Sequence, residues 1–285
     1  MGRISSLNIL LSTSGKDYLA EQYGAVIANL QKACISQQIK NAALSGTPGA
    51  GTYEAKRFVN KTSNSYGTAR TAAHGQYVKA EPVVIQVNTD KEIVVEVEEK
   101  DVMLYGVDNL VEREAASAQK AMTRELERAF FTEAANQGTA FTPSAGATTA
   151  DKIIEELIQS VETVSNDYVD GVERDMITVV CKPSLYGQLR SYFDAVSHDG
   201  NSESFGRFHG VKVFSSVYLP SGTAAVAMAD GSIAQPVLPT VAPAERIPLS
   251  NAIGFGIFYS YGTKAVAADL IYAYADSSTT TTTGA

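Results

Sequence analysis

The most constraining feature of this sequence is a long polar segment at residues 52–101, followed at once by an amphipathic helix predicted over 105–135. The pattern predicts a hairpin with two strand-forming arms, one near 57–59 and the other made of 83–85 and 93–97. Isolated two-stranded hairpins are only marginally stable in water, and this one contains few large apolar residues. We therefore expect it to be stabilised by a partner, most simply another copy of the chain. This favours an assembly protein over a self-contained enzyme.

Charge is distributed unevenly along the two arms. Residues 56–79 carry only basic charges, whereas 81–101 are mainly acidic. Two interpretations remain open: an ordinary solvated hairpin, or docking onto neighbouring subunits with charge fixing the register more than the affinity. We favour docking, and apolar side chains that alternate with acidic ones over 92–98 predict a half-buried strand there. The candidate inter-subunit contacts are Lys56, Arg57, Lys61, Arg70, Lys79, Glu92, Glu96 and Glu98.

The first 51 residues are predicted to form an arm rather than a domain. Helical periodicity extends over 18–44, and the Gly- and Pro-containing stretch 45–51 ends it. We expect partners to order this arm. The helix at 105–135 has one broad apolar stripe, and its opposite side, which includes Glu127, is charged. At about 1.5 Å per residue, such a helix is long enough to serve as a structural spine.

The second half of the chain mixes helices and strands without regular alternation, which indicates the α+β class. A linker is expected at 137–150 and a Thr-rich mobile tail at 277–285. The predicted elements are helices at 150–166 and 183–193, strands at 176–181, 211–214 and 224–228, and a late hairpin of 257–261 and 265–273 around Gly262.

Composition excludes several classes of function. The net charge of −8 argues against a dedicated sequence-reading nucleic-acid binder, although weak local contact with DNA stays open. Two distant cysteines, Cys34 and Cys181, form no disulfide framework or metal cluster. No apolar stretch approaches the roughly 20 residues that span a bilayer, and no secretory signal is recognisable. We therefore expect a protein made in a cytoplasm, without a membrane partner.

The sequence offers only weak signals for chemistry. The segment 46–52 spaces its glycines like a phosphate-binding loop, but it lacks the lysine, the preceding strand and the following helix, and we expect a flexible joint. The histidines His74, His198 and His209 lack metal-ligand spacing, and Ser232 lacks the second glycine of a nucleophile elbow. We expect no catalytic, cofactor or metal site, although groups distant in sequence could still converge in space.

Three segments resemble the major capsid proteins of tailed bacteriophages. Residues 174–190 (RDMITVVCKPSLYGQLR) resemble the strand–Pro–helix segment that opens their axial domain. Residues 205–220 are similar to their G-x-x-x-G-V-x-V-x-x-S-x-x-L-P segment, and 258–266 resemble their terminal strand with its YG-x-K turn. The arm, the extended loop and the long helix occur in the same order, so the resemblance covers about residues 15–275.

The resemblance implies a tailed-phage major capsid fold with a defined order of segments. These are an N-terminal arm (1–51), an extended loop (52–101), a peripheral domain with the spine helix (102–150), an axial domain (151–254), returning strands (255–275) and a tail (276–285). It also implies pentamers and hexamers that form the icosahedral head of a double-stranded DNA phage, assembled in the host cytoplasm. Implied partners are the chain itself, a portal protein, packaged DNA bound without sequence specificity and, because the chain starts at Met1, a separate scaffolding protein. A decoration protein is a further expected partner.

Some members of the family join a loop lysine to an asparagine of a neighbour. Lys56, Lys61 and Asn60 lie in the corresponding region, but the sequence identifies no reacting pair. Three alternatives remain open. An encapsulin-type compartment is disfavoured by the long arm and loop, and a phage tail or other structural β-protein by the two long helices. An oligomeric enzyme would show a deep pocket lined by convergent polar groups.

Overall fold

The computed structural model describes residues 7–47, 51–63, 77–98, 100–102, 106–196 and 207–276. Arg70 and His74 with the rest of residues 64–76, His198, and the tail at 277–285 lie outside these ranges. The chain divides into two compact units, each built from three separated segments rather than from one continuous stretch. The first unit contains Met1–Gln38, Gln86–Phe130 and Gln235–Thr263, and the second contains Ile39–Ile85, Phe131–Ala234 and Lys264–Ala285.

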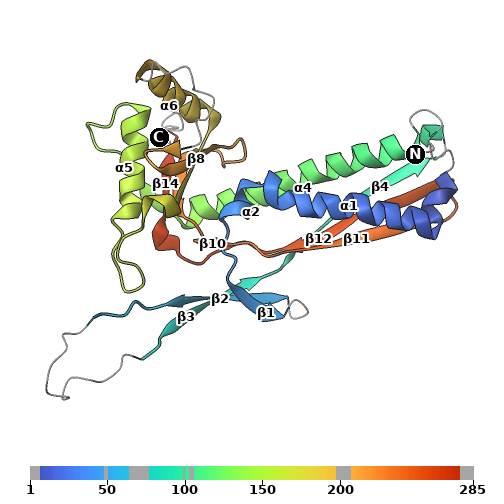
Figure 1. Cartoon of the computed structure of the whole chain (residues 1–285), viewed down its shortest axis with the longest axis horizontal. Helices are drawn as coiled ribbons and strands as arrows, with labels where there is room; N and C mark the ends of the chain where they lie inside the picture. The colour runs from blue at the N-terminus through green and yellow to red at the C-terminus, as the bar shows by residue number, and fades with distance from the viewer. Residues whose placement is uncertain are drawn as a thin grey trace, which may run out of the picture. The chain divides into compact units, whose positions relative to one another are not determined.

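The first unit packs helices α1 (Thr13–Ala33) and α4 (Val107–Gln137, residues 107–130 here) against a three-stranded antiparallel sheet (Figure 1). The order of its strands is β11 (Val237–Arg246), β12 (Ala252–Tyr261) and β4 (Thr89–Glu98). Strand β4 points Ile93, Val95 and Val97 into the core and exposes its glutamates, as the alternating pattern predicted. The short helix η1 (Leu7–Leu11) adds Leu7 and Leu10 to the same core.

The N-terminal segment differs from the prediction in its bounds and its environment. Helix α1 begins at Thr13 because the Ser12 hydroxyl caps it, accepting the Gly15 N–H at 3.2 Å. It ends at Ala33, and the short helix α2 (Ile35–Ile39) follows. Its apolar stripe, which includes Leu19 and Tyr23, is buried in the core of its own chain. The expectation that partners order this segment is therefore wrong for α1.

The long helix is confirmed as α4, with one correction on its charged side. Glu127 is only 3% exposed, and its carboxylate accepts the backbone N–H of Ile35 at 2.7 Å. The first N–H groups of a helix have no partner within the helix, and an acidic side chain near a helix start also suits the helix dipole. Glu127 therefore satisfies the start of α2 instead of facing solvent.

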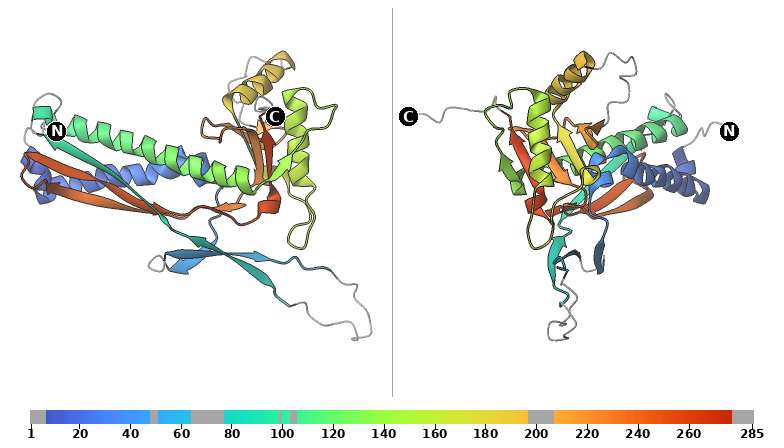
Figure 2. Two further views of the ribbon diagram at one scale, coloured as in Figure 1. Left: turned by 180° about the vertical axis from the view of Figure 1, so that it is seen from behind. Right: turned by 60° about the vertical axis from the view of Figure 1, so that its left-hand side comes forward.

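The second unit contains a six-stranded mixed sheet in the order β5-β14-β9-β6-β8-β7, with α5 (Ala150–Glu162) and α6 (Pro183–Val196) packed on one core (Figure 2). The predicted helices and strands of this region are confirmed, except that α5 ends at Glu162 rather than at residue 166. Strand β6 is buried along its whole length, as its unbroken apolar run predicted. The strands are β5 (Thr139–Phe141), β6 (Ile177–Cys181), β7 (Arg207–Phe208), β8 (Val211–Ser215), β9 (Thr223–Ala229) and β14 (Ile271–Ala275). Two 3-10 turns, η4 (Arg174–Met176) and η6 (Ala268–Leu270), precede β6 and β14.

The predicted late hairpin around Gly262 is wrong. Strand β12 pairs with β11 and β4 in the first unit, whereas β14 pairs with β9 and β5 in the second. Between them, β13 (Lys264–Ala265) pairs with β10 (Ile233–Ala234). The expected linker at 137–150 also contributes a strand, β5, which joins the sheet in parallel with β14.

A separate three-stranded sheet forms the base of the extended hairpin. Its order is β1 (Leu44–Thr47), β2 (Thr52–Phe58) and β3 (Ala80–Gln86), and Figure 2 shows β2 and β3 side by side. The glycine-rich segment 46–52, expected to be a flexible joint, contributes residues 46–47 to β1 and Thr52 to β2, and its residues 48–50 lie outside the described ranges. The two strands pair from Leu44 and Ala55 to Thr47 and Thr52. Residues 93–97, assigned above to the second arm, belong to β4 in the other unit.

Candidate functional site

The two hairpin arms leave their base joined by few contacts and carry exposed apolar side chains. Beyond the paired strands, the Val59 N–H donates to the Lys79 carbonyl at 3.1 Å, and the Lys61 ammonium donates to the Tyr77 carbonyl. Phe58, Tyr77 and Val78 are 57%, 87% and 76% exposed. A group of exposed large apolar residues on one element is typical of an interaction surface.

A small apolar cluster and a polar cluster hold the base of the hairpin within the second unit. The apolar cluster contains Ala55 of β2, Ile85 of β3, Ala234 of β10 and Val266. The Lys264 ammonium adds a hydrogen bond to the Val84 carbonyl at 3.2 Å. Each arm therefore has its own attachment at the base.

The polar cluster, which we call the base cluster, consists of Arg57, Glu81, Asn166, Tyr168 and Asp269. The Arg57 guanidinium contacts the Asp269 carboxylate at 2.5 Å, and its central carbon lies 4.3 Å from the centre of the Tyr168 ring. The Tyr168 hydroxyl donates to Glu81 at 2.6 Å, and the Asn166 amide donates to Asp269. A guanidinium can form an ion pair in its plane and stack on an aromatic face at the same time.

Hydrogen bonding in the base cluster favours an ionised Asp269 and a neutral Tyr168. Burial opposes ionisation of Asp269, but hydrogen bonding and charge from Arg57 outweigh it, and the pKa of Asp269 falls below its usual value. The hydrogen bond to Glu81 raises the pKa of Tyr168. A concavity of about 470 Å³ is lined by Arg57, Asn166, Asp167, Tyr168 and Asp269. Most of these side chains bond to one another rather than converging on a free centre, so the concavity does not have the signature expected for an enzyme.

The acidic candidates lie on the outward face of β4 in the first unit. Glu92, Glu96 and Glu98 are exposed there, with Val94 between them and Phe258 on the neighbouring strand β12. Glu98 pairs with Lys100 at 2.5 Å. A groove of about 460 Å³ on this sheet is lined mainly by apolar side chains, among them Val94, Pro243 and Phe258. The face therefore combines acidic and exposed apolar groups.

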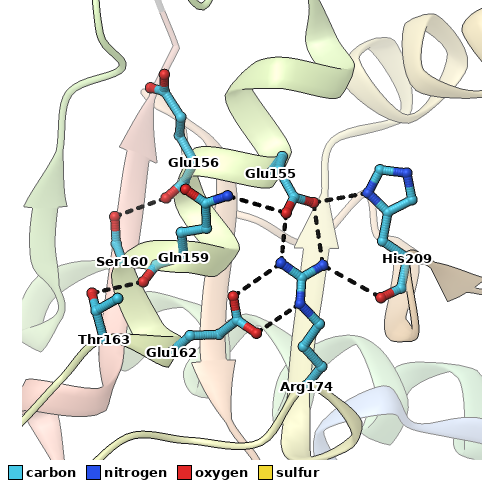
Figure 3. Close-up of polar contacts among 8 residues, drawn as sticks. All are labelled: Glu155, Glu156, Gln159, Ser160, Glu162, Thr163, Arg174 and His209. Atoms are coloured by element: carbon cyan, nitrogen blue, oxygen red, sulfur yellow. Dashed lines mark hydrogen bonds and ion pairs between the residues drawn. The ribbon is translucent and has the colours of Figure 1, made fainter.

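A second polar network, centred on Arg174, lies in the second unit (Figure 3). Arg174 contacts Glu162 through Nε at 2.7 Å and Glu155 through Nη2 at 2.5 Å. His209 Nδ1 lies 2.9 Å from Glu155. His209 and Gly210 have φ values of 45° and 93° and form the two-residue turn between β7 and β8, a geometry typical of tight hairpins. The network joins α5, η4 and this turn.

The structure separates the sequence-predicted contacts into three groups. Lys56, Lys79, Glu92, Glu96 and Glu98 are exposed. Arg57 and Lys61 have partners in their own chain, and Arg70 lies outside the described residues. The sequence reasoning missed Asp269 and Tyr168 as partners of Arg57, and it missed the Arg174 network, because these groups converge from distant segments and have no characteristic spacing.

A family model described as "Phage capsid protein" matches residues 81–275, which is well over half of the chain. The chain belongs to the phage capsid protein family. Solved structures agree on the fold: this capsid protein matches "Mycobacterium phage Che8" with a TM-score of 0.58 and 19% identity, covering 79% of this chain and 84% of that one. The resemblance stated from the sequence is thereby confirmed, and the α+β fold is that of the phage capsids.

Two further matches show how widely the fold is shared. The "capsid of native GTA particle" matches with a TM-score of 0.56 and 12% identity over 85% of this chain and 90% of that one. A virus-like particle from Pyrococcus furiosus matches with a TM-score of 0.57 and 10% identity over 90% and 99%. No curated protein matches the capsid protein. The fold alone thus occurs in several kinds of particle, and the family match favours the phage capsid.

The described ranges contain neither a membrane-spanning helix nor a cluster of metal-ligating residues. None of the described helices combines the length and apolarity needed to cross a bilayer. Where the structure describes the capsid protein, no cluster of three or more His, Cys, Asp or Glu residues could hold a metal ion.

Proposed function

We propose that this protein is the major capsid protein of a tailed phage, and that its pentamers and hexamers close an icosahedral head around double-stranded DNA. The observation that carries the proposal is the family match over residues 81–275. The exposed apolar residues of the hairpin support it, since a self-contained protein would not be expected to present Tyr77 and Val78 to water. In this role the protein acts by burying interfaces and performs no catalysis.

Exposed charges on both units supply the proposed contacts between subunits. Lys56 and Lys79 flank the apolar hairpin residues, and Glu92, Glu96 and Glu98 line the outward face of β4 beside Val94. Opposite charges on two surfaces suppress wrong registers and speed encounter more than they add affinity. We therefore assign the basic hairpin of one subunit to an acidic face of another, whereas Arg57 and Lys61 act within their own chain.

The remaining partners follow from the proposed role. A separate scaffolding protein, a portal protein and a decoration protein would bind the shell, and the genome would be enclosed without sequence-specific contacts. The charge of −8 suits a shell that does not hold DNA tightly. Tight binding of DNA depends on basic side chains that neutralise its phosphates, and the affinity that they add falls as the salt concentration rises. Tight DNA binding combined with salt-insensitive assembly would contradict this part of the proposal.

Negative-stain electron microscopy of the purified protein, expressed alone and with a candidate scaffolding protein, tests the proposal. Closed shells or capsomer rings are the expected result. A discrete monomer or dimer under both conditions would overturn the proposal.

A compartment of the encapsulin type is the second candidate, because the match to the Pyrococcus furiosus virus-like particle covers 99% of that chain. Particles isolated from the natural source and treated with nuclease separate the two. DNA protected inside the particle supports the phage head, whereas a DNA-free particle that contains an enzyme supports the compartment.

A further inference from the structure

We infer that the base cluster is a latch that fixes the direction in which the extended hairpin leaves its own subunit. The cluster joins both arms to elements outside the hairpin. Arg57 of β2 reaches Asp269 of η6, and Glu81 of β3 receives the hydroxyl of Tyr168 from the loop that follows α5. Because Tyr168 also lies under the Arg57 guanidinium, one side chain contacts both arms.

Arg57 is held from two directions at once. The Asp269 carboxylate lies 2.5 Å from Nη2, and the Tyr168 ring centre lies 4.3 Å from the guanidinium carbon. An ion pair alone allows the arm to pivot about one contact, whereas an added stacking contact also fixes the plane of the guanidinium. Asn166 holds the Asp269 carboxylate through a further hydrogen bond. The contacts therefore restrict orientation as well as distance.

The apolar base extends less far along the two arms than the polar contacts do. Its buried members are Ala55, Ile85, Ala234 and Val266, and the partly buried Leu44, Tyr53 and Val83 pack against them. The hydrogen bond from the Asn60 N–H to the Asp167 carbonyl, at 2.9 Å, extends the attachment by three residues beyond Arg57. Past this point, the contact seen for Lys61 is with Tyr77 of the opposite arm. The contacts of Arg57 and Asn60 therefore restrain the first arm beyond the apolar base.

The latch contributes little to global stability, which separates a directional role from a structural one. The Arg57 and Asp269 side chains are 17% and 33% exposed, and partly exposed ion pairs add little to the free energy of folding. The effect of the latch on assembly rests on the proposed function. A hairpin already held in its bound direction loses less conformational freedom when it meets a neighbour, which favours association.

Distance measurements between two spin labels in the second unit test the latch directly. Cys34 and Cys181 are fully buried, so cysteines introduced at the exposed positions Ser63 and Lys152 can be labelled selectively. The labelled protein is mixed with an excess of unlabelled protein, so that label pairs between subunits are rare. Arg57→Gln removes the guanidinium, and Lys56→Gln removes an equal charge from the exposed neighbouring position on the same strand.

We expect Arg57→Gln to broaden the label–label distance distribution at least about twofold, while Lys56→Gln leaves it unchanged. The thermal midpoints of both variants should stay within about 2 °C of the parent protein. Asp269→Asn provides a second variant from the other side of the ion pair and should broaden the distribution in the same way. An unchanged, narrow distribution in either folded latch variant would overturn the inference. A distance distribution that is broader in Arg57→Lys than in Arg57→Gln would also overturn it.

Assembly is measured separately on the unlabelled variants. If the parent protein forms no shells with any scaffold, the proposed function fails, and the distance measurements still decide whether the latch exists. If the parent protein assembles, Arg57→Gln should give several-fold fewer shells at equal concentration than Lys152→Gln, which removes an equal charge from an exposed position of α5. Equal yields would overturn the role of the latch in assembly.

Discussion

Arg174 is a single residue on which the arrangement of several elements depends. Glu155 and Glu162 lie on the same side of α5, and both carboxylates point at one guanidinium (Figure 3). The two hydrogen-bonded carboxylates raise the pKa of Arg174 above its usual value. Without the arginine, two partly buried carboxylates would face each other without a shared cation.

We expect Arg174→Met to lower the free energy of unfolding by roughly 2 kcal/mol, because the unpaired carboxylates lose charged hydrogen bonds. Arg190→Met, at an exposed position of α6, is the matched control and should change the stability by less than about 0.5 kcal/mol. Urea unfolding followed by circular dichroism measures both. Equal effects from the two variants would contradict the role assigned to Arg174.

The pH dependence of stability should reveal the lowered pKa of Glu155. Burial opposes its ionisation, but hydrogen bonds from Arg174, His209 and Gln159 outweigh the burial and lower its pKa from 4.5 to about 2. A carboxyl group whose pKa is lower in the folded state than in the unfolded state stabilises the protein at pH values above its unfolded-state pKa. This contribution is lost as the pH falls through the folded-state pKa. The stability difference between the parent protein and Glu155→Gln should therefore be largest above pH 4.5 and shrink towards pH 2. A difference that grows on acidification would disprove the assignment.

At the scale of elements, the pairing of β12 with β4 depends on a glycine. Gly256 lies opposite Val94, and a Cβ there would lie far inside contact distance of the Ile93 backbone oxygen. At Gly254, two residues earlier on the same strand, an added Cβ would have its nearest neighbouring atom at 3.8 Å. The same substitution at these two positions therefore meets different surroundings.

We expect Gly256→Ala to destabilise the protein by about 1–3 kcal/mol, since the backbones of β12 and β4 must separate to admit the methyl group. Gly254→Ala should stay within about 0.5 kcal/mol of the parent protein. Thermal unfolding and amide hydrogen exchange of β4 measure the change, with faster exchange expected only in the Gly256 variant. If Gly254→Ala were the more harmful of the two, the close approach would not control the pairing.

The elements differ in how well the sequence predicts them. Helix α4 and strand β6 were found because periodicity and a continuous apolar run are local signals. The partner of β12 was missed because β4 lies more than a hundred residues away in the chain, and alternation identifies a strand without identifying its neighbour. Strand β11 was missed because it contains Pro239 and Pro243. Both are tolerated because β11 is an edge strand, and Pro243 also lies at the register shift between Ala242 and Glu245.

At the scale of the whole molecule, the residues of the cores and the residues proposed for assembly form different groups. The two main cores are built from α1, α4 and the first sheet, and from α5, α6 and the second sheet. None of the described residues beyond Phe58 in the first arm, or before Val83 in the second, belongs to a core cluster. The sequence singled out the charged segment that we propose for assembly, but it did not show which of its residues are held within the subunit. That division depends on Asp269 and Tyr168, which lie far away in the chain.

This separation predicts the effect of removing the end of the hairpin. Deleting residues 62–71 should leave a soluble, folded subunit, because the deletion removes no core residue that the structure describes. The variant should fail to form stable shells, since it loses length that the hairpin needs to reach a neighbour. Replacing the same residues with an equal number of glycines and serines controls for length, and we expect this variant to assemble partially. Circular dichroism measures folding, and negative-stain microscopy with sedimentation measures shells. Normal shells from the deletion would remove the hairpin from the assembly mechanism, whereas an unfolded subunit would show that folding and assembly share these residues.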